Sequence, residues 1–223
     1  MMDFAAARRI MVDSQVRPND VADLRLIAAM QALPRERFLP AEHADLAYLD
    51  FDVPATVAEA GKPTRRLLKP MVLAKLIQAA EIAEGDHVLD VGCATGYSSA
   101  ILGRLAHAVV ALEQDAGLAE LARDNLRALG GIMVEVAIGP LSAGWPSQAP
   151  YDVIVLNGAF DITPKALLRQ LKPGGRLVGV LGRGPLGKAM LYCSIGGESG
   201  GRPIFDAAAP LLPGFTAPEA FVF

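Results

Sequence analysis

Cysteine and histidine are scarce in this chain of 223 residues, which has two of the first and three of the second. Cys93 and Cys193 stand far apart, and their spacing indicates two free thiols rather than a disulfide framework. His43, His87 and His107 show no metal-ligand spacing with cysteine or with acidic residues. The sequence therefore predicts neither a disulfide scaffold nor a metal site.

Long apolar runs and a strong excess of one charge are also missing. No apolar run is long enough to cross a bilayer, and no basic segment followed by an apolar run marks a secretion signal. The formal net charge of -3 gives no field that would draw the protein to nucleic acid or to an anionic membrane. We expect a cytoplasmic protein that binds neither nucleic acid nor membrane, and its oligomeric state stays open.

The residues that are present favour a packed globule, because 52% are hydrophobic and 20% are charged. Residues 1–80 are expected to form an N-terminal helical and irregular extension on the acceptor side. Apolar spacing and a run of prolines predict a helix over 4–12, a helix over 21–33, an irregular stretch over 34–64 and a helix over 71–82. Asn19 and Asp20 are the expected N-caps of the second helix, and Pro70 fits the first turn of the third.

Residues 81–223 alternate between strand and helix and are expected to form the cofactor-binding core. Strands are predicted over 87–91, 108–112, 132–138, 151–156 and 176–181, helices over 97–106, 116–129 and 164–171, and a turn over 172–175. A strand over 189–195, a glycine-rich loop over 196–201 and a last apolar stretch follow. This pattern is typical of an α/β fold with a doubly wound, mostly parallel Rossmann-like sheet, here with a C-terminal antiparallel hairpin.

The segment after the first predicted strand is rich in small residues. It reads Asp90-Val91-Gly92-Cys93-Ala94-Thr95-Gly96 and leads into a helix. Gly92 and Gly96 allow a tight turn and a close approach of the backbone to a ligand. In doubly wound sheets, ligands bind beyond the carboxyl ends of the strands. Glu113 ends the second strand, where a carboxylate can accept both hydroxyls of a ribose.

The spacing of the two glycines separates two classes of cofactor. Dinucleotide sites carry G-x-G-x-x-G and place a pyrophosphate at the helix N-terminus. Here the spacing is G-x-x-x-G, and Asp90 precedes the first glycine by two residues. A carboxylate there would repel a pyrophosphate but suits a ligand with an ammonium and a sulfonium. The loop thus favours S-adenosylmethionine over a nicotinamide cofactor, and an oxidoreductase is disfavoured.

Cys93 is expected to serve as a small side chain, since no basic residue flanks it to stabilise a thiolate.

Loop 90–96 together with Glu113 resembles the cofactor motif of class I S-adenosylmethionine-dependent methyltransferases. Within that class, the chain resembles the protein-L-isoaspartate O-methyltransferases. The segments that carry this similarity are Val16-Arg17, Pro34-Arg35-Glu36-Arg37-Phe38-Leu39-Pro40, Ala47-Tyr48-Leu49-Asp50, Ala149-Pro150-Tyr151-Asp152-Val153-Ile154-Val155 and Leu168-Arg169-Gln170-Leu171-Lys172-Pro173-Gly174-Gly175-Arg176-Leu177-Val178. They span most of the chain, and the run from Pro34 to Pro40 is the more specific to the isoaspartyl family.

The resemblance implies an enzyme of protein repair. The family methylates the stray carboxylate of an isoaspartyl residue in damaged proteins, with S-adenosylmethionine as the methyl donor. The chemistry depends on alignment of carboxylate oxygen, methyl carbon and sulfur more than on acid–base groups. The partner is a protein or peptide carboxylate. Cofactor contacts are implied at Asp90, Gly92, Cys93, Ala94, Gly96, Glu113 and Gly139.

The acceptor side departs from the family pattern. The family has Thr-Ile-Ser-Gln-Pro before the third helix, with the serine hydroxyl beside the reacting carboxylate. This chain has Arg66-Leu67-Leu68-Lys69-Pro70 there, and Leu68 cannot donate a hydrogen bond. Two further segments also differ: Gly139-Pro140-Leu141 replaces Gly-Asp-Gly, and Asn157-Gly158-Ala159 replaces Thr-Ala-Ala.

No catalytic residue is therefore assigned, and three hypotheses stay open. The first is an isoaspartyl methyltransferase, for which weak or absent activity is expected. The second is a diverged methyltransferase with another acceptor. The third is a non-catalytic module that binds S-adenosylmethionine. Arg65, Arg66 and Lys69 would either meet an anionic acceptor or form a solvated rim.

Overall fold

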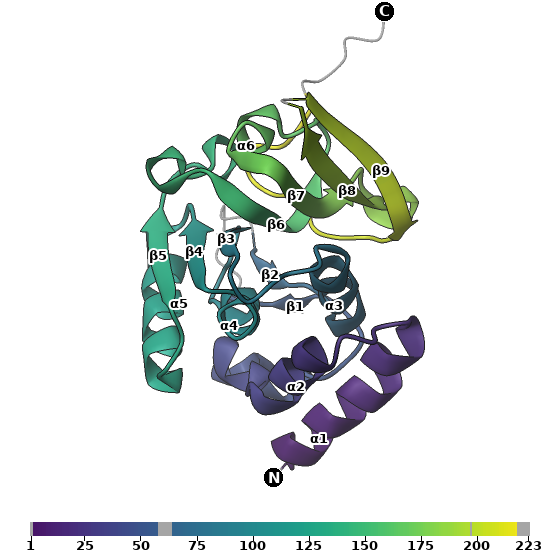
Figure 1. Cartoon of the computed structure of the whole chain (residues 1–223). Helices are drawn as coiled ribbons and strands as arrows, with labels where there is room; N and C mark the ends of the chain where they lie inside the picture. Colours follow the sequence, from purple (N-terminus) through teal and green to yellow (C-terminus); the bar gives the residue numbers. More distant parts are fainter. Residues whose placement is uncertain (1, 58–63, 197, 218–223) are drawn as a thin grey trace, which may run out of the picture.

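A seven-stranded sheet forms the centre of the computed structural model, which describes residues 2–57, 64–196 and 198–217 (Figure 1). The strand order is β5-β4-β3-β6-β7-β8-β9, parallel from β5 to β7 and antiparallel at β8 and β9. The strands are β3 (His87–Val91), β4 (Ala108–Glu113), β5 (Val134–Ile138), β6 (Tyr151–Phe160), β7 (Leu171–Leu181), β8 (Lys188–Ile195) and β9 (Glu198–Asp206). The predicted α/β fold with an antiparallel C-terminal edge is confirmed. Strand order reverses beside β3, which marks the carboxyl end of this strand as a place for a ligand.

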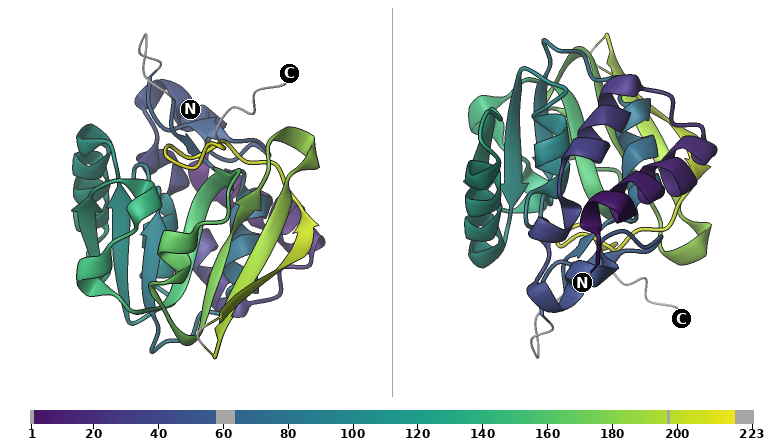
Figure 2. Two further views of the ribbon diagram at one scale, coloured as in Figure 1. Left: turned by 90° about the horizontal axis from the view of Figure 1, so that it is seen from above. Right: turned by 90° about the horizontal axis from the view of Figure 1, so that it is seen from below.

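Helices cover both faces of the sheet (Figure 2). They are α1 (Phe4–Met11), α2 (Leu24–Ala32), α3 (Pro70–Ala79), α4 (Tyr97–Leu102), α5 (Ala116–Leu129) and α6 (Lys165–Leu168). Apolar residues of α1 to α5 share one core cluster with the sheet, whereas α6 packs into a second cluster on the opposite face. A two-stranded antiparallel ribbon, β1 (Val53–Pro54) and β2 (Arg66–Leu67), lies outside the main sheet. No helix among the described residues combines the length and apolar character that a membrane span requires.

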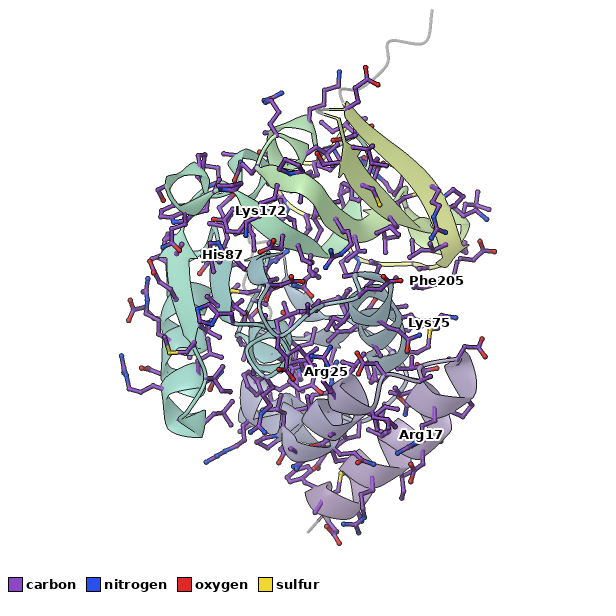
Figure 3. The ribbon with its side chains drawn as sticks, viewed as in Figure 1. Arg17, Arg25, Lys75, His87, Lys172 and Phe205 are labelled. Carbon is purple, nitrogen blue, oxygen red and sulfur yellow. The ribbon has the colours of Figure 1, made fainter. Side chains whose placement is uncertain are left out.

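The alternation of side chains along β3 explains the two clusters. Val88 packs on the face of α1 to α5, and Leu89 packs on the face of α6. The N-terminal extension is joined to the sheet through the first cluster rather than forming a core of its own. Polar contacts add to this attachment. Arg25 of α2 donates to the carbonyl of Ile82 at 2.5 Å, and the Lys75 ammonium of α3 lies 4.8 Å from the ring centre of Phe205 in β9 (Figure 3).

Several element ends differ from the sequence prediction. The N-cap of α2 is Asp23, whose side chain accepts from two backbone N–H groups, because Asp20 adopts a left-handed conformation and ends the preceding turn. Helix α4 ends at Leu102 and α6 spans four residues, so the predictions 97–106 and 164–171 were too long. The predicted turn over 172–175 lies within β7, where pairing with β6 shifts register. The predicted loop over 196–201 is wrong from Glu198 onward, since β9 begins there.

Candidate functional site

The loop after β3 is held in a conformation that small residues permit. Gly92, Ala94 and Gly96 all have positive φ, at 77°, 51° and 95°. Gly96 is the N-cap residue of α4, and a Cβ there would lie 3.3 Å from Ala122 of α5. Ala94 is the exception, because an alanine in the left-handed region stores strain of a kind that clusters at functional sites. The loop is thus shaped by tight backbone geometry at the carboxyl end of β3, as predicted.

Glu113 lies beside this loop at the end of β4, and its side chain is 1% exposed. Its Oε1 accepts from the backbone N–H groups of Gln114 and Asp115, at 2.8 and 3.3 Å. Its Oε2 accepts from the backbone N–H of Ala94 at 2.9 Å. These backbone donors fix the carboxylate at the mouth of the loop. The structure therefore brings Glu113 and the loop together.

Arg65 occupies a place that the sequence did not indicate. Its Nη2 donates to Oε2 of Glu113 at 3.2 Å and to the carbonyl of Gly92 at 2.9 Å. The side chain is 10% exposed, and its Nε has no hydrogen-bond partner among the described residues. Arg65 is therefore not part of a solvated rim. No local pattern could have placed it here, because its two partners lie 27 and 48 residues along the chain.

Asp90 points away from the loop and toward α4. Its Oδ2 accepts from the hydroxyls of Ser98 and Ser99, at 2.8 and 2.5 Å, and its Oδ1 accepts from the amide of Asn157. Burial raises the pKa of Asp90 to about 6, an effect that these three donors oppose and that the charge of Glu113 reinforces. The carboxylate thus links the end of β3 to α4 and to β6. The expected contact of Asp90 with a cofactor stays a prediction.

One cavity adjoins Glu113, and a second adjoins the loop. The larger measures about 360 Å³ and lies between Glu113, Arg65 and the first turns of α5, where Leu118 and Leu121 supply an apolar wall. The smaller measures about 10 Å³. The predicted residues that line the smaller one are Gly92, Cys93, Ala94, Arg66, Leu67 and Leu68. The structure thus joins the predicted cofactor loop and the predicted acceptor segment in one chamber.

Other predicted residues make contacts outside the lining of these cavities or are buried. Gly139 donates its backbone N–H to the carbonyl of Glu113 at 3.0 Å and packs against Trp145, a partly buried residue that packs on the second core cluster. The backbone N–H of Lys69 donates to a carboxylate oxygen of Asp52 at 2.8 Å. Burial and nearby negative charges raise the pKa of the Cys93 thiol well above its usual range, which argues against a nucleophilic thiolate.

Arg35, a fully buried residue of the Pro34 to Pro40 run, holds the acceptor segment, residues 66–70. Its Nη2 donates to the carbonyl of Leu68 at 2.8 Å, and its Nε donates to the carbonyl of Ala47 at 2.7 Å. Its guanidinium carbon lies 4.7 Å from the ring centre of Tyr97. Burial lowers the pKa of Arg35. Sequence reasoning singled out this run but missed what Arg35 contacts.

The chain after β9 returns across the carboxyl ends of the central strands (Figure 2, yellow). The backbone N–H of Leu212 donates to the carbonyl of Ala159 at 2.9 Å, and the N–H of Ala159 donates to the carbonyl of Pro210 at 2.7 Å. A Cβ built on Gly92 would lie 2.9 Å from Leu212 and 2.6 Å from Arg65. These two side chains therefore fill the space above the first glycine of the loop.

Comparisons with known proteins identify a family and related sequences. The sequence pattern of the family described as "Protein-L-isoaspartate(D-aspartate) O-methyltransferase (PCMT)" matches residues 8–191. A protein-L-isoaspartate O-methyltransferase from Methylorubrum extorquens is 41% identical over 79% of this chain and 74% of its own length. One from Koribacter versatilis is 40% identical over 78% of this chain and 76% of its own length.

Two solved structures share the fold. A protein-L-isoaspartate O-methyltransferase matches with a TM-score of 0.76 at 24% identity, over 94% of this chain and 65% of that one. A Plasmodium falciparum protein of the same description, crystallised with S-adenosyl-L-homocysteine, matches with a TM-score of 0.75 at 14% identity, over 95% of this chain and 99% of that one.

Proposed function

Because this chain belongs to the protein-L-isoaspartate(D-aspartate) O-methyltransferase family, we propose that it transfers a methyl group from S-adenosylmethionine to a carboxylate of a protein or peptide. One observation supports this proposal most strongly. Glu113, at the end of β4, lies beside both the glycine loop after β3 and the cavity of about 360 Å³. A carboxylate, a close-approach glycine and an apolar wall together suit a nucleoside.

The residues around the larger cavity fit the adenosyl half of the cofactor. The carboxylate of Glu113 would accept the ribose hydroxyls, and Leu118 and Leu121 would contact the base. Gly92 would let the backbone approach the ligand, with Cys93, Ala94, Gly96 and Gly139 shaping the surroundings. Asp90 would act indirectly, by holding the loop on α4. The methionyl half would take the space beside Gly92 that the side chains of Arg65 and Leu212 now fill.

When bound, the cofactor supplies a methyl group on a sulfonium. The neutral thioether that departs when the methyl group is transferred is a good leaving group. The chain has little acid–base work to do, because the acceptor carboxylate is already an ionised nucleophile. Leu67, Leu68 and Tyr97 form the chamber wall and would exclude water from the acceptor. Arg66 is exposed next to them and would bring positive charge toward an anionic acceptor. Catalysis then rests on positioning.

The residue at the family's serine position bears on which carboxylate is methylated. Leu68, at the family's serine position, is a buried aliphatic wall that is 2% exposed. This observation favours a slow reaction with isoaspartyl carboxylates, or a different carboxylate acceptor that needs no hydroxyl donor at this point. A role limited to cofactor binding is the remaining alternative.

The proposal is tested by methyl transfer from methyl-labelled S-adenosylmethionine to an isoaspartyl peptide, with the matching aspartyl peptide and a cell extract as parallel acceptors. We expect base-labile methyl esters on the isoaspartyl peptide, formed slowly, and fewer on the aspartyl peptide. Labelling of extract proteins alone would indicate a different acceptor. Cofactor binding without methyl transfer to any acceptor would overturn the proposed catalytic activity. Absence of cofactor binding would overturn the whole proposal.

A further inference from the structure

Arg65 stands where the proposed function requires the cofactor. Its Nη2 donates to Oε2 of Glu113 at 3.2 Å, and this oxygen also accepts from the N–H of Ala94. The other oxygen already accepts from two backbone N–H groups. A carboxylate offers about four lone-pair positions, and all four contacts are present here. The ribose hydroxyls and Arg65 therefore compete for the same carboxylate.

The same guanidinium also blocks the close approach to the loop. Nη2 donates to the carbonyl of Gly92 at 2.9 Å, and a Cβ on Gly92 would meet this nitrogen at 2.6 Å. The space that glycine leaves open is thus taken by Arg65 as well as by Leu212. The unpartnered, buried Nε of Arg65 indicates that this position does not satisfy the guanidinium fully. A ligand whose hydroxyls take over Glu113 would move the guanidinium off this carboxylate, while its charge would stay within the cavity that Arg65 lines.

The charge of Arg65 adds a second consequence. S-adenosylmethionine carries one more positive charge than S-adenosylhomocysteine, because its sulfur is a sulfonium. Arg65 is linked to the carbonyl of Gly92, at the boundary of the adenosyl cavity and the small chamber where the sulfur would lie. In a site with little water, two positive charges at such range repel each other appreciably. The neutral thioether meets no such repulsion.

Resting on the proposed function, we propose that Arg65 is a specificity-determining residue of the cofactor site. It competes with the ribose for Glu113, and its charge biases the site toward the neutral product S-adenosylhomocysteine over the cationic S-adenosylmethionine. The site then responds to the ratio of the two ligands and not only to the amount of methyl donor.

The test is calorimetric binding of S-adenosylmethionine and S-adenosylhomocysteine to the whole chain and to three variants. Arg65→Gln removes the charge, and Arg65→Lys keeps the charge but loses the planar fork. Arg127→Gln is the matched control, because Arg127 is exposed on α5 and pairs with Asp124 rather than with Glu113. Thermal unfolding of each variant without ligand shows whether it is folded.

We expect Arg65→Gln to bind both ligands more tightly and to shift the ratio of their dissociation constants by about tenfold in favour of S-adenosylmethionine. Arg65→Lys should keep the wild-type ratio, and Arg127→Gln should change neither constant. If Arg65→Gln fails to fold, an unchanged ratio in Arg65→Lys together with tighter binding of both ligands still supports the competition.

An unchanged ratio in folded Arg65→Gln would overturn the inference while leaving the proposed function intact. Equal weakening of both ligands would also overturn it, because Arg65 would then be a cofactor contact. Binding by Arg65→Gln but not by the wild-type chain would support the inference and reject catalysis by the wild type. No binding by any variant would reject both.

Discussion

Replacing Leu68 with serine tests what its side chain does at the acceptor. Leu68 is 2% exposed and lines the chamber of about 10 Å³ together with Tyr97 and Asn157. Its carbonyl is held by Arg35, so the backbone should stay in place when the side chain changes. Truncation of a buried leucine costs about 2–5 kcal/mol of the free energy of unfolding. Leu68→Ser should therefore remain folded only with a clearly lowered melting temperature.

The gain expected from Leu68→Ser is a hydrogen-bond donor at the reacting carboxylate. One such donor in a desolvated site is worth a factor of about 10²–10³ in rate. We expect slow methylation of an isoaspartyl peptide by the wild-type chain and a faster rate for Leu68→Ser, up to that factor. Leu68→Ala is the matched control, because it removes similar volume without adding a hydroxyl.

Initial rates at saturating cofactor, measured at a temperature where all three proteins are folded, decide the question. Equal rates for Leu68→Ser and Leu68→Ala would show that the hydroxyl has no carboxylate to meet. Rapid turnover by the wild-type chain would refute the reasoning more directly, since another group would then perform the task of the serine.

Two other substitutions probe the loop. Gly92→Val should abolish the rise in melting temperature that S-adenosylhomocysteine gives the wild-type chain. The reason is that a Cβ there meets Arg65 at 2.6 Å and Leu212 at 2.9 Å, and that φ is 77°. Equal shifts in both proteins would argue against a close approach of the backbone to the ligand. The pKa of Asp90 is raised to about 6 in the folded protein. Between about pH 4 and pH 6 the folded state therefore binds more protons than the unfolded state. This group thus makes the free energy of unfolding fall as pH rises through that window. Asp90→Asn should flatten this slope in urea unfolding, and an unchanged slope would assign it to other groups.

The elements that could be predicted from sequence are those with strong local signals. Strand β3 and helix α5 have the predicted bounds, His87–Val91 and Ala116–Leu129. In β3 the signal was a short apolar run before small residues, and in α5 it was helical spacing that ends at Gly130. The positions of Glu113 and the loop also followed, because parallel strands bring their carboxyl ends to one edge of the sheet.

The parts of the site that could not be predicted depend on contacts between distant segments. Arg65 reaches Glu113 across 48 residues, and Arg35 reaches Leu68 across 33. Leu212 comes from a segment without periodicity that lies across the loop. Neither residue type nor spacing distinguishes a buried arginine from a solvated one, so only the packed chain reveals which carbonyl or carboxylate it meets. The N-cap of α2 was missed for a simpler reason, since several acidic or amide residues precede that helix.

The central claim is that Glu113 takes the ribose of S-adenosylmethionine or its product. Calorimetric titration of S-adenosylhomocysteine into the wild-type chain and into Glu113→Gln tests this most directly, with Glu120→Gln as the control because Glu120 is exposed and pairs with Arg123. Hydrogen bonds to a charged group contribute about 1.5–3 kcal/mol, so Glu113→Gln should raise the dissociation constant by roughly tenfold or more while Glu120→Gln leaves it unchanged. An equal dissociation constant in the wild-type chain and in folded Glu113→Gln would contradict the claim.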